Sequence, residues 1–390
     1  MRILHVAPSI ARAYGGPTHS LAAYVRAAQL HVCECTIVAP DASADDVASL
    51  EQSAPDAAVR LFPSQGAGAF VWSPALVRFV RLHAGDYDVV HVHGLLNPVS
   101  SLAARACRRA GAPVVIRPFG TMSRYTFQHR RRALKRAYHA AIDAPNLRAA
   151  AAVHFTTATE RDEASWLGIA VDERAYVIPP PAFELSTPPA RAVPAEPRAF
   201  TALIVSRLDP VKNIELLLDA WTVVRAKLDS ARLVIAGEGP DRYRRSLVER
   251  AGRLGVGAAV DFVGYAGPAG KQALYADADV FVLPSKHENF GIAALEALAA
   301  GLPVVVSRHV QLADVIEAHG LGVVVPATRQ ALADALLSLA SNVGWRRACG
   351  ARAPRVVAEA FSPVVVGGAL RAMYESVSTD LHEHLATAFA

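Results

Sequence analysis

The sequence predicts an α/β protein with two domains, each built on a parallel β-sheet that is covered by helices on both faces. Two observations predict this fold. Short apolar runs rich in β-branched residues alternate with amphipathic stretches of helical length, which is the pattern of parallel strands buried between helices. The alternation occurs twice along the 390 residues, once on each side of a segment rich in proline and alanine. At roughly 150 residues a domain, the chain is long enough for two or three cores.

The first half contains six apolar runs that we expect to be strands: 3–8, 35–40, 59–63, 89–94, 114–120 and 153–157. The expected helices between them cover 17–29, 75–83, 99–110 and 129–148. The second half repeats the pattern, with expected strands at 202–208, 232–238, 260–264, 280–284, 303–307 and 322–326. The segments 178–181 and 185–197 between the halves are rich in proline and lack apolar periodicity, so we expect a linker there.

The composition excludes several classes of protein. Apolar residues make up 52% of the chain and charged residues 19%, so the chain is not largely disordered. The net charge of +5 is too small an excess to indicate a nucleic-acid-binding protein. No uncharged apolar run reaches the roughly 18 residues that span a bilayer, and the apolar start is too short for a secretory signal. The 4 cysteines lack the spacing of a zinc site or a disulfide framework, so we expect a reducing compartment, the cytoplasm.

A loop followed by a helix carries the two most informative carboxylates. Glu288 follows the apolar run at 280–284, and Glu296 lies about two turns into the helix that follows Gly291. Both carboxylates can therefore face one ligand that lies along the helix. Gly291 allows a ligand to approach the first turn, where backbone N–H groups and the helix dipole favour phosphate. Carboxylates accept hydrogen bonds from hydroxyls, so this arrangement suits a sugar nucleotide. The alternative is a pair of solvated glutamates on a surface helix, which the position of Glu288 and Gly291 before the helix makes the weaker interpretation.

A second motif, at 206–213, directly follows the first strand of the second half and contains Arg207 and Lys212. Open α/β sheets bind their ligands at the carboxyl ends of the strands, which is where these two side chains are expected. A guanidinium and an ammonium together suit a diphosphate, and one such contact amounts to about 4 kcal/mol before desolvation at roughly 4 Å. Either residue alone would indicate only a solvated basic side chain near a turn.

Together these residues resemble the retaining glycosyltransferases of family 4, the group 1 glycosyltransferases, which have the GT-B fold. The resemblance covers nearly the whole chain and also includes Gly15-Gly16-Pro17, His91-Val92-His93-Gly94, Gly237-Glu238-Gly239-Pro240 and Gly301-Leu302-Pro303-Val304-Val305. It implies two Rossmann-like domains that face each other across a cleft, with 1–185 binding the acceptor and 198–361 binding the donor. We expect the helical stretch 362–390 to cross back onto the first domain.

The resemblance also implies a role for each charged residue of the predicted site. Arg207 and Lys212 would bind the donor diphosphate, Glu288 the hydroxyls of the donor sugar, and Glu296 the ribose. Similar enzymes need no metal, because arginine, lysine and a helix terminus stabilise the leaving nucleoside diphosphate. No Asp-x-Asp follows a predicted strand. We therefore expect no metal and no other cofactor.

Backbone and glycine contacts complete the site that the resemblance implies. A loop of the first domain would come against the diphosphate, and backbone groups of the second domain would surround the sugar and phosphates. The residues expected in these roles are Gly15, Gly16, Gly237, Asn289, Phe290 and Gly291.

One position departs from the family pattern. Many members carry a histidine near the reacting sugar in the segment that here reads Arg117-Pro118-Phe119-Gly120-Thr121, and the matching position is Phe119. Phenylalanine cannot exchange a proton or hydrogen-bond a hydroxyl. Three interpretations stay open: another polar group replaces the histidine, the donor phosphate acts as the base, or the enzyme is impaired. Our first candidate for the polar group is His93. The expected catalytic residues are therefore Glu288 and His93. The alternative is that His93 is a core histidine at the end of a strand.

Basic residues crowd into the span 105–138, which contains almost no acids and ends in the helix-compatible run 129–138. A solvated surface normally mixes both signs, and RNA recognition would require interleaved aromatic residues and a known module. An anionic membrane surface or a lipid pyrophosphate is the partner that this charge favours, at roughly 1 kcal/mol for each basic residue near the membrane.

The sequence therefore predicts a retaining, metal-independent glycosyltransferase. It would move a hexose from a UDP- or GDP-sugar to a hydroxyl of a glycan or of a polyprenyl-pyrophosphate-linked glycan, in bacterial polysaccharide biosynthesis. The expected location is the cytoplasm, with peripheral contact to the inner face of the cell membrane, and no nucleic acid is expected as a partner. Two alternatives stay open: a GT-B sugar-nucleotide epimerase, and a non-catalytic subunit that binds a sugar nucleotide, which Phe119 motivates.

Overall fold

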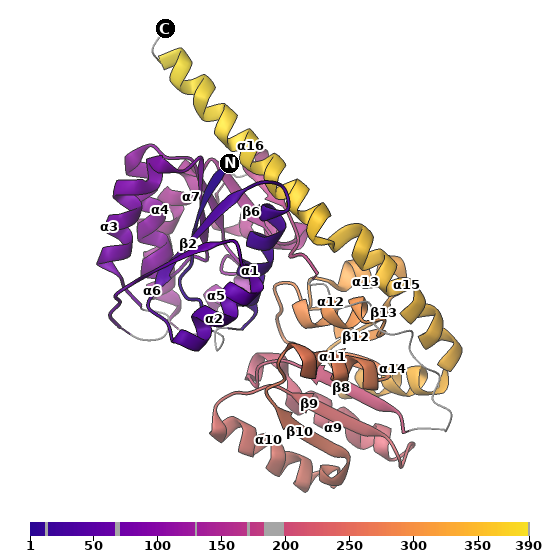
Figure 1. Cartoon of the computed structure of the whole chain (residues 1–390). Coiled ribbons are helices and arrows are strands. Elements are labelled where there is room, and N and C mark those ends of the chain that lie inside the picture. The colour runs from indigo at the N-terminus through magenta and orange to yellow at the C-terminus, as the bar shows by residue number, and fades with distance from the viewer. Residues whose placement is uncertain (12–14, 67–70, 129–130, 170–171, 183–198, 389–390) are drawn as a thin grey trace. The chain divides into compact units, whose positions relative to one another are not determined.

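The computed structural model describes residues 1–11, 15–66, 71–128, 131–169, 172–182 and 199–388 (Figure 1). The chain divides into two compact units. Unit 1 consists of Met1–Pro181 together with Phe361–Ala390, and unit 2 consists of Ala182–Ala360. The proline-rich segment 185–197, where we expected a linker, lies outside the described residues.

Within the described residues, the strands of unit 1 form one seven-stranded parallel sheet in the order β3-β2-β1-β4-β5-β6-β7. Its strands are β1 (Arg2–Val6), β2 (Glu34–Pro40), β3 (Ala58–Phe62), β4 (Val89–His93), β5 (Val114–Arg117), β6 (Ala152–Phe155) and β7 (Ala175–Val177). The sequence predicted the first six. It missed β7, because a strand of 3 residues is too short to show a pattern.

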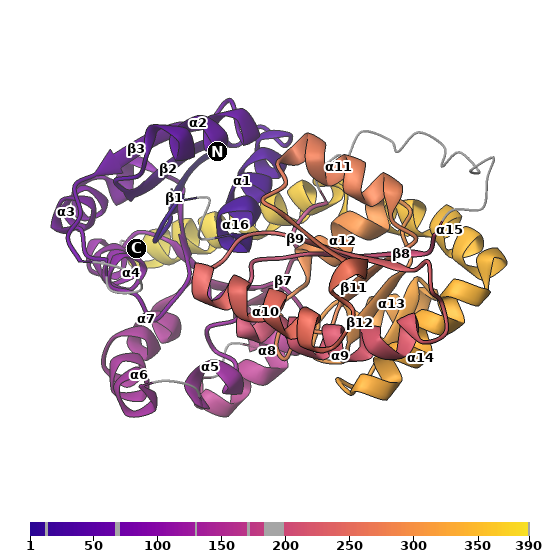
Figure 2. The ribbon, with the colours of Figure 1, turned by 90° about the horizontal axis from the view of Figure 1, so that it is seen from below.

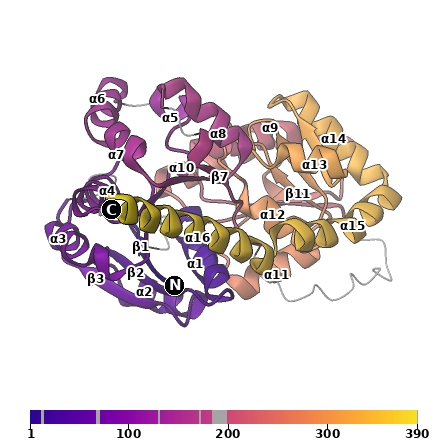
Figure 3. The ribbon, with the colours of Figure 1, turned by 90° about the horizontal axis from the view of Figure 1, so that it is seen from above.

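Helices cover both faces of this sheet (Figures 2 and 3). One face carries α3 (Pro74–His83), α4 (Pro98–Ala110) and α7 (Ala144–Ala149). The other carries α1 (Gly16–Gln29), α2 (Ala44–Ser53) and α16 (Pro363–Ala388). Two short helices, α5 (Arg124–Gln128) and α8 (Ala158–Ala164), follow β5 and β6. The helix boundaries have local causes: Asn97 accepts the N–H of Ser100 at the start of α4, and Gly111 ends that helix at a φ of 69°.

The span 129–148, where we expected a helix, is helical from Arg132 on in its described part, but it is not a regular α-helix. The described part of this span forms α6 (Arg132–Tyr138), one π-helical turn (His139–Asp143) and α7. The π-turn contains a polar contact: the buried carboxylate of Asp143 accepts hydrogen bonds from the Ser101 hydroxyl and from the N–H of Leu96. A local π-turn places that carboxylate against α4, at the cost of helical regularity.

The stretch Val343–Thr379 is long and apolar enough, by length and hydropathy alone, to cross a membrane. Two helices make up this stretch, α15 (Val343–Phe361) and α16. The helix α16 runs beside α1 in unit 1 (Figure 3). Its residues Leu370, Met373 and Tyr374 are fully buried and belong to the core that α16 shares with α1 and the sheet. This burial accounts for the hydropathy of α16 as that of a core helix.

Within the described residues, unit 2 has a six-stranded parallel sheet in the order β10-β9-β8-β11-β12-β13. Its strands are β8 (Thr201–Val205), β9 (Arg232–Ala236), β10 (Val260–Gly264), β11 (Val280–Leu283), β12 (Val304–Ser307) and β13 (Gly322–Val325). The sequence predicted all six. The helices are α9 (Ile214–Arg225), α10 (Asp241–Arg253), α11 (Pro268–Asp277), α12 (Ile292–Ala299), α13 (Ala313–His319), α14 (Arg329–Ser341) and α15.

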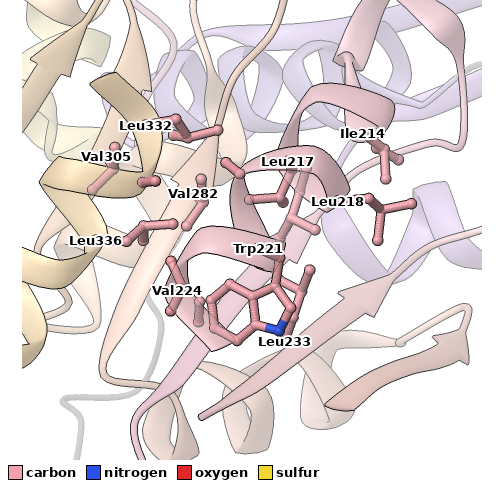
Figure 4. Close-up of a cluster of buried hydrophobic side chains, with 14 of the residues drawn as sticks. Ile214, Leu217, Leu218, Trp221, Val224, Leu233, Val282, Val305, Leu332 and Leu336 are labelled. Carbon is pink, nitrogen blue, oxygen red and sulfur yellow. The ribbon is translucent and has the colours of Figure 1, made fainter. Parts of the chain in front are cut away.

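An apolar core of unit 2 lies between the sheet and helices α9 and α14 (Figure 4). Trp221 and Val224 of α9, Leu336 of α14 and Val282 of β11 are all fully buried there. Side chains of this size each gain about 1.5–3 kcal/mol from leaving water, so this contact fixes α9 against the sheet. The segment that precedes α9 is thereby held at the carboxyl edge of β8.

Both sheets share a feature that positions ligands. The first strand of each unit has the second strand on one side and the fourth on the other, so that β1 lies beside β4 and β8 lies beside β11. The chain reverses its direction of winding between such strands, and the crevice outside their carboxyl ends is where open α/β sheets bind ligands. In unit 2 the segments 206–213 and 284–291 lie at this point.

Candidate functional site

Lys212 is held rigidly at the carboxyl edge of β8. Asp209 caps the turn Pro210–Lys212, with its Oδ1 accepting the N–H of Val211 at 2.9 Å. The next residue, Asn213, has a φ of 58°, and its side-chain Nδ2 donates to the carbonyl of Pro284 at 3.2 Å. The loops after β8 and β11 are therefore tied together at the switch point, and Lys212 lies between them.

Lys212 and Glu288 form an ion pair across these two loops. Their side chains are 14% and 19% exposed, and the hydroxyl of Ser285 donates to the same carboxylate at 3.3 Å. The sequence predicted that both residues bind one ligand, and the structure brings them into direct contact. A partly buried ammonium and carboxylate at one point offer a donor for phosphate oxygens beside an acceptor for hydroxyls.

Arg207 lies two residues after the end of β8, and its side chain is exposed. It makes no hydrogen bond or ion pair with any residue that the structure describes. Its five N–H donors are thus available to an anion at the same edge of the sheet as Lys212.

Glu296 is held on the second turn of α12, where it is 9% exposed. One of its oxygens accepts from Lys271 Nζ at 2.6 Å and the other from the hydroxyl of Tyr275 at 2.8 Å. Burial, and then the negative charge of Glu296, raises the pKa of Tyr275 well above its usual value. Sequence reasoning missed Lys271 and Tyr275, although their i, i+4 spacing on α11 places both on one helix face toward the predicted glutamate.

Gly237 is required by the way the loops of unit 2 pack. Its φ is 134°, and a Cβ at this position would lie 1.8 Å from the carbonyl oxygen of Ser206. The N–H of Leu208 donates to the carbonyl of Glu238 at 2.7 Å, so the loops after β8 and β9 run in backbone contact. The structure thus gives Gly237 a packing role that holds the Arg207 loop in place.

Gly291 begins α12 at a φ of 101°, and a Cβ there would lie 2.8 Å from a methyl group of Val310. The preceding backbone is engaged with the segment 309–312: Glu288 N–H donates to the carbonyl of His309 at 3.0 Å, and the carbonyl of Phe290 accepts from Leu312 at 3.1 Å. Phe290 is buried and Asn289 partly exposed. These contacts fix the 288–291 turn that carries the Glu288 side chain.

In unit 1, the predicted glycine loop begins α1. Gly15 has a φ of 75° and is the N-cap, and its carbonyl accepts the N–H of Thr18 at 3.1 Å. No side chain caps this helix, which starts at Gly16 with Pro17 in its first turn. The preceding residues 12–14 lie outside the described part of the chain.

Four histidines of the unit 1 strands form a buried polar row beneath α1 and α16. The polar row comprises His5 on β1, His91 and His93 on β4, and His154 on β6, each 6% exposed or less. Burial, followed by the positive charge of Arg117, lowers the pKa of His5 and His154 to about 3. Burial also lowers the pKa of His91 and His93 well below the usual value, so all four rings are neutral at pH 7.

A directed hydrogen-bonded chain runs through this row. The carbonyl of Ile178 can only accept, so His154 donates to it from Nε2 at 2.8 Å. His154 Nδ1 then accepts from His91 Nε2 at 3.3 Å, and His91 Nδ1 accepts from the hydroxyl of Tyr374 at 2.8 Å. Each of these groups is satisfied in its neutral form, and the chain ties α16 to β4, β6 and the end of β7.

His93 lies within this row, with its Nε2 at 3.0 Å from His5 Nδ1. The structure thus gives it the surroundings of a core histidine, and the catalytic role stays a prediction. Ring nitrogens of His5, His91 and His93 lie within 4.8 Å of one another, which would suit a metal ion. The buried guanidinium of Arg117 on the neighbouring strand opposes a cation there.

Phe119 lies just beyond β5, and its side chain is partly exposed. The guanidinium of Arg117 stacks between the rings of Phe119 and Tyr24, 4.3 Å from each centroid, and donates to Ser20 of α1 at 2.7 Å. The buried carboxylate of Glu160 accepts the N–H of Gly120 and, at 2.7 Å, that of Thr156. These contacts fix the loop after β5 between α1 and α8.

Family models match both units. The description "Glycosyl transferases group 1" covers residues 190–356, and "Glycosyl transferase 4-like domain" covers residues 15–181. The phosphatidyl-myo-inositol mannosyltransferase of Mycobacterium leprae is 32% identical over 317 residues, which are 79% of each chain. The chain belongs to the group 1 glycosyltransferases.

Another relative and two solved structures of other proteins are also similar to this glycosyltransferase. A GDP-mannose-dependent alpha-(1-6)-phosphatidylinositol dimannoside mannosyltransferase of Mycobacterium tuberculosis is 37% identical over 160 residues, 40% of each chain. Anabaena HepE in complex with UDP and glucose is similar in structure, with a TM-score of 0.75, 19% identity and coverage of 96% of this chain and 100% of HepE. Sucrose-phosphate synthase from Thermosynechococcus elongatus has a TM-score of 0.71 at 19% identity, covering 100% and 99% of the two chains. These structures show that the fold is GT-B, as the sequence predicted.

Proposed function

We propose that this glycosyltransferase transfers a hexose from a UDP- or GDP-sugar to a hydroxyl of a glycan or lipid-linked glycan, with retention at the anomeric carbon. One observation carries the proposal: Lys212 and Glu288 form an ion pair at the switch point of the unit 2 sheet, and Arg207 follows the same strand, β8. A sugar nucleotide would find donors for its diphosphate there beside an acceptor for its sugar hydroxyls. The proposal draws on relatives that use GDP-mannose and phosphatidylinositol lipids, according to their names.

The chemistry proposed for these residues is electrostatic. As the bond from the sugar to the phosphate breaks, negative charge grows on the leaving diphosphate, and Arg207 and Lys212 supply positive charge there without a metal ion. Lys212 exchanges part of its contact with Glu288 for the phosphate, which frees carboxylate lone pairs for sugar hydroxyls. Glu296, held by Lys271 and Tyr275, accepts from the ribose hydroxyls. The uncapped start of α1, at Gly15 and Gly16, offers backbone N–H groups that suit a phosphate.

A direct test begins with a thermal-shift screen against UDP, GDP, ADP and their sugars. A ligand at 100 times its dissociation constant adds about 2.7 kcal/mol of stability, which gives a clear shift. Turnover of the stabilising donor is then measured in the wild type and in Glu288→Gln, as transfer or as slow hydrolysis. The amide keeps its size but replaces acceptor sites with donors, so turnover should fall strongly while the bare nucleoside diphosphate still binds. Full activity in Glu288→Gln would contradict this placement of the sugar.

A second part of the proposal concerns location: the protein works in the cytoplasm and touches the inner face of the cell membrane through α6. This helix presents exposed Arg132 and Arg136 with exposed Leu134, while Lys135 turns back to the carbonyl of Thr126 at 2.6 Å. A short basic helix with an apolar side chain suits anionic lipid headgroups and an acceptor that is itself bound to lipid, as in bacterial polysaccharide assembly.

Co-sedimentation with liposomes tests this location. Binding should require anionic lipid, should fade between low salt and about 0.5 M salt, and should weaken in Arg132→Gln/Arg136→Gln. Arg244→Gln/Arg245→Gln on α10, another exposed pair, is the matched control and should bind like the wild type. Binding that ignores both lipid charge and salt would refute the contact.

A second candidate function is a non-catalytic subunit that binds a sugar nucleotide, and the phenylalanine at position 119 favours it. It predicts firm donor binding with neither transfer nor hydrolysis. Measurable turnover of any donor by the wild type eliminates it.

A further inference from the structure

Phe119 has a backbone conformation that an aromatic residue rarely adopts. Its φ is 56°, in the left-handed region where a side chain with a Cβ is strained. Glycine takes this conformation at little cost, but position 119 holds a phenylalanine. The glycine is the next residue, Gly120, which also has a positive φ, of 74°. A strained residue at the carboxyl edge of a sheet persists only when its surroundings hold it, and such residues cluster at ligand sites.

Three contacts hold Phe119 in place. The turn is closed by Thr121, whose N–H and hydroxyl donate to the carbonyl of Pro118 at 3.3 and 2.6 Å. Gly120 donates its N–H to Glu160, which is 2% exposed. Arg117, 1% exposed, covers one face of the phenyl ring at 4.3 Å. Phe119 as a residue is nevertheless only partly buried, and these contacts hold its ring in one orientation.

We propose that Phe119 is a specificity-determining residue that binds the apolar face of a pyranose ring. The C–H groups on that face of a sugar carry partial positive charge, and the face of an aromatic ring carries negative charge, so the two stack. Arg117 and Glu160 act as positioning residues that orient the ring. The inference rests on the proposed glycosyl transfer and deepens it. Position 119, which has a phenylalanine instead of a histidine, would bind a sugar and would not exchange a proton.

Three substitutions at position 119 distinguish the effect of the aromatic ring from the effect of the backbone conformation. Phe119→Gly removes the ring and relieves the backbone strain, but it also uncovers the buried guanidinium of Arg117 and adds conformational freedom to the unfolded chain, so its melting temperature is measured beside that of Phe119→Leu. Phe119→Leu keeps apolar bulk without an aromatic face. Phe119→Trp keeps an aromatic face and adds a fluorescent reporter. We expect the Gly and Leu variants to raise the KM for the stacked sugar at least 10-fold with kcat changed less than 3-fold, and the Trp variant to stay near the wild-type KM.

The source of the pyranose is resolved by two arms of the experiment. Hydrolysis of GDP-mannose or UDP-glucose without acceptor reports the donor ring, and transfer to methyl α-mannopyranoside or methyl α-glucopyranoside reports an acceptor ring. The affinity for bare GDP or UDP is the control and should be the same in all variants. An unchanged KM in both arms for the Gly and Leu variants overturns the proposal.

A binding measurement keeps this inference separable from the proposed function. If the wild type turned over no sugar nucleotide, the proposed transfer would fail, while Phe119→Trp could still be titrated with the two methyl glycosides. The wild-type protein, titrated in parallel, corrects for emission from the native tryptophans. A saturable change in the emission of the introduced indole, absent with glycerol as a non-cyclic polyol, supports the stacking surface. The absence of such a change with both glycosides overturns it.

Discussion

The two units share a strand order but differ in where they keep their polar groups. In unit 1 a row of polar side chains lies inside, between the sheet and α1 and α16, with His91 and His154 completely buried. The apolar core of unit 2 contains side chains such as Trp221 and Val282, and the charged groups Arg207 and Lys212 of that unit lie in loops at the carboxyl edge of the sheet. One α/β architecture thus carries its polar residues in two different places.

This difference indicates two different uses of polarity. Within the polar row of unit 1, a chain of hydrogen bonds runs from Ile178 through His154 and His91 to Tyr374 and joins separate segments of the chain. The polar row therefore contributes to the folding of unit 1. Among the described residues, His5 Nε2 and His93 Nδ1 have no hydrogen-bond partner. The edge charges of unit 2 are only partly satisfied within the protein, so they can serve a ligand. Changes in the row should therefore affect folding, and changes at the edge should affect binding.

The largest expected effect is on the acid stability of unit 1. The folded pKa of His5 and of His154 is about 3, below the unfolded value of 6.5, so the unfolded chain binds more protons as the pH falls below 6.5. Stability is therefore lost on acidification. Between pH 7.5 and pH 5.5 each of these two histidines should cost about 1.4 kcal/mol, together about 3 kcal/mol, and His91 and His93 act in the same direction.

Hydrogen exchange resolved by peptide measures this loss separately in each unit. After correction for intrinsic exchange rates, peptides from β4 and β6 should lose protection at pH 5.5 far more than peptides from β8 and β11. An equal loss in both units would show that the polar row does not set the acid stability.

The next largest effect concerns nucleotide binding at the edge of unit 2. Arg207→Ala and Lys212→Ala should each weaken binding of the nucleoside diphosphate roughly 30-fold, about 2 kcal/mol, because each removes a charge-assisted contact. Arg207→Ala should leave the melting temperature unchanged, since that side chain is exposed. Lys212→Ala should lower it slightly, because Glu288 loses its partner. Calorimetric titration with UDP and GDP provides the measurement, and unaltered affinity in both variants would sink the assignment.

Much of the fold could be predicted because strands buried on both faces are continuous apolar runs. The run at 280–283 forms β11, and unit 2 followed the prediction strand by strand. The π-turn before α7 was not predicted: Asp143 in this turn contacts Ser101 and Leu96, which are far away in sequence. No local pattern contains that information.

The candidate site was predictable to the extent that it follows strands. Arg207, Lys212 and Glu288 lie just after β8 and β11, so topology alone brings them to one edge. Lys271 was missed because it lies on a different helix, α11, and its contact with Glu296 on α12 is a tertiary contact. The polar row was missed because alternate histidines on a strand look alike whether they face a ligand or a core.

A smaller effect is expected from Tyr374→Phe in α16. The substitution removes the hydroxyl that donates to His91 Nδ1 at 2.8 Å and leaves a buried acceptor unpaired, which should cost about 1–1.5 kcal/mol of unfolding free energy. Tyr176→Phe, which loses only a partly buried bond to Ser376 at 3.0 Å, is the matched control and should cost less. Urea unfolding followed by circular dichroism gives both values, and nucleotide affinity should not change in either variant. A Tyr374→Phe protein as stable as the wild type would mean that the row does not hold α16.

The smallest effect is expected for a charged pair at the opposite edge of the unit 2 sheet from Arg207 and Lys212. Arg232 at the start of β9 pairs with Asp261 on β10 at 2.6 Å, but the two side chains are 60% and 40% exposed. Exposed pairs of this kind contribute about 0–1 kcal/mol, because water screens them and two long side chains must be ordered. Arg232→Gln should therefore leave nucleotide affinity unchanged and alter the unfolding free energy by less than about 1 kcal/mol, a difference that shrinks further in about 0.5 M salt. Titration of this variant beside Arg207→Ala compares two exposed arginines of one sheet. A similar loss of affinity in both would show that net charge, and not position at the carboxyl edge of β8, governs binding of the nucleotide.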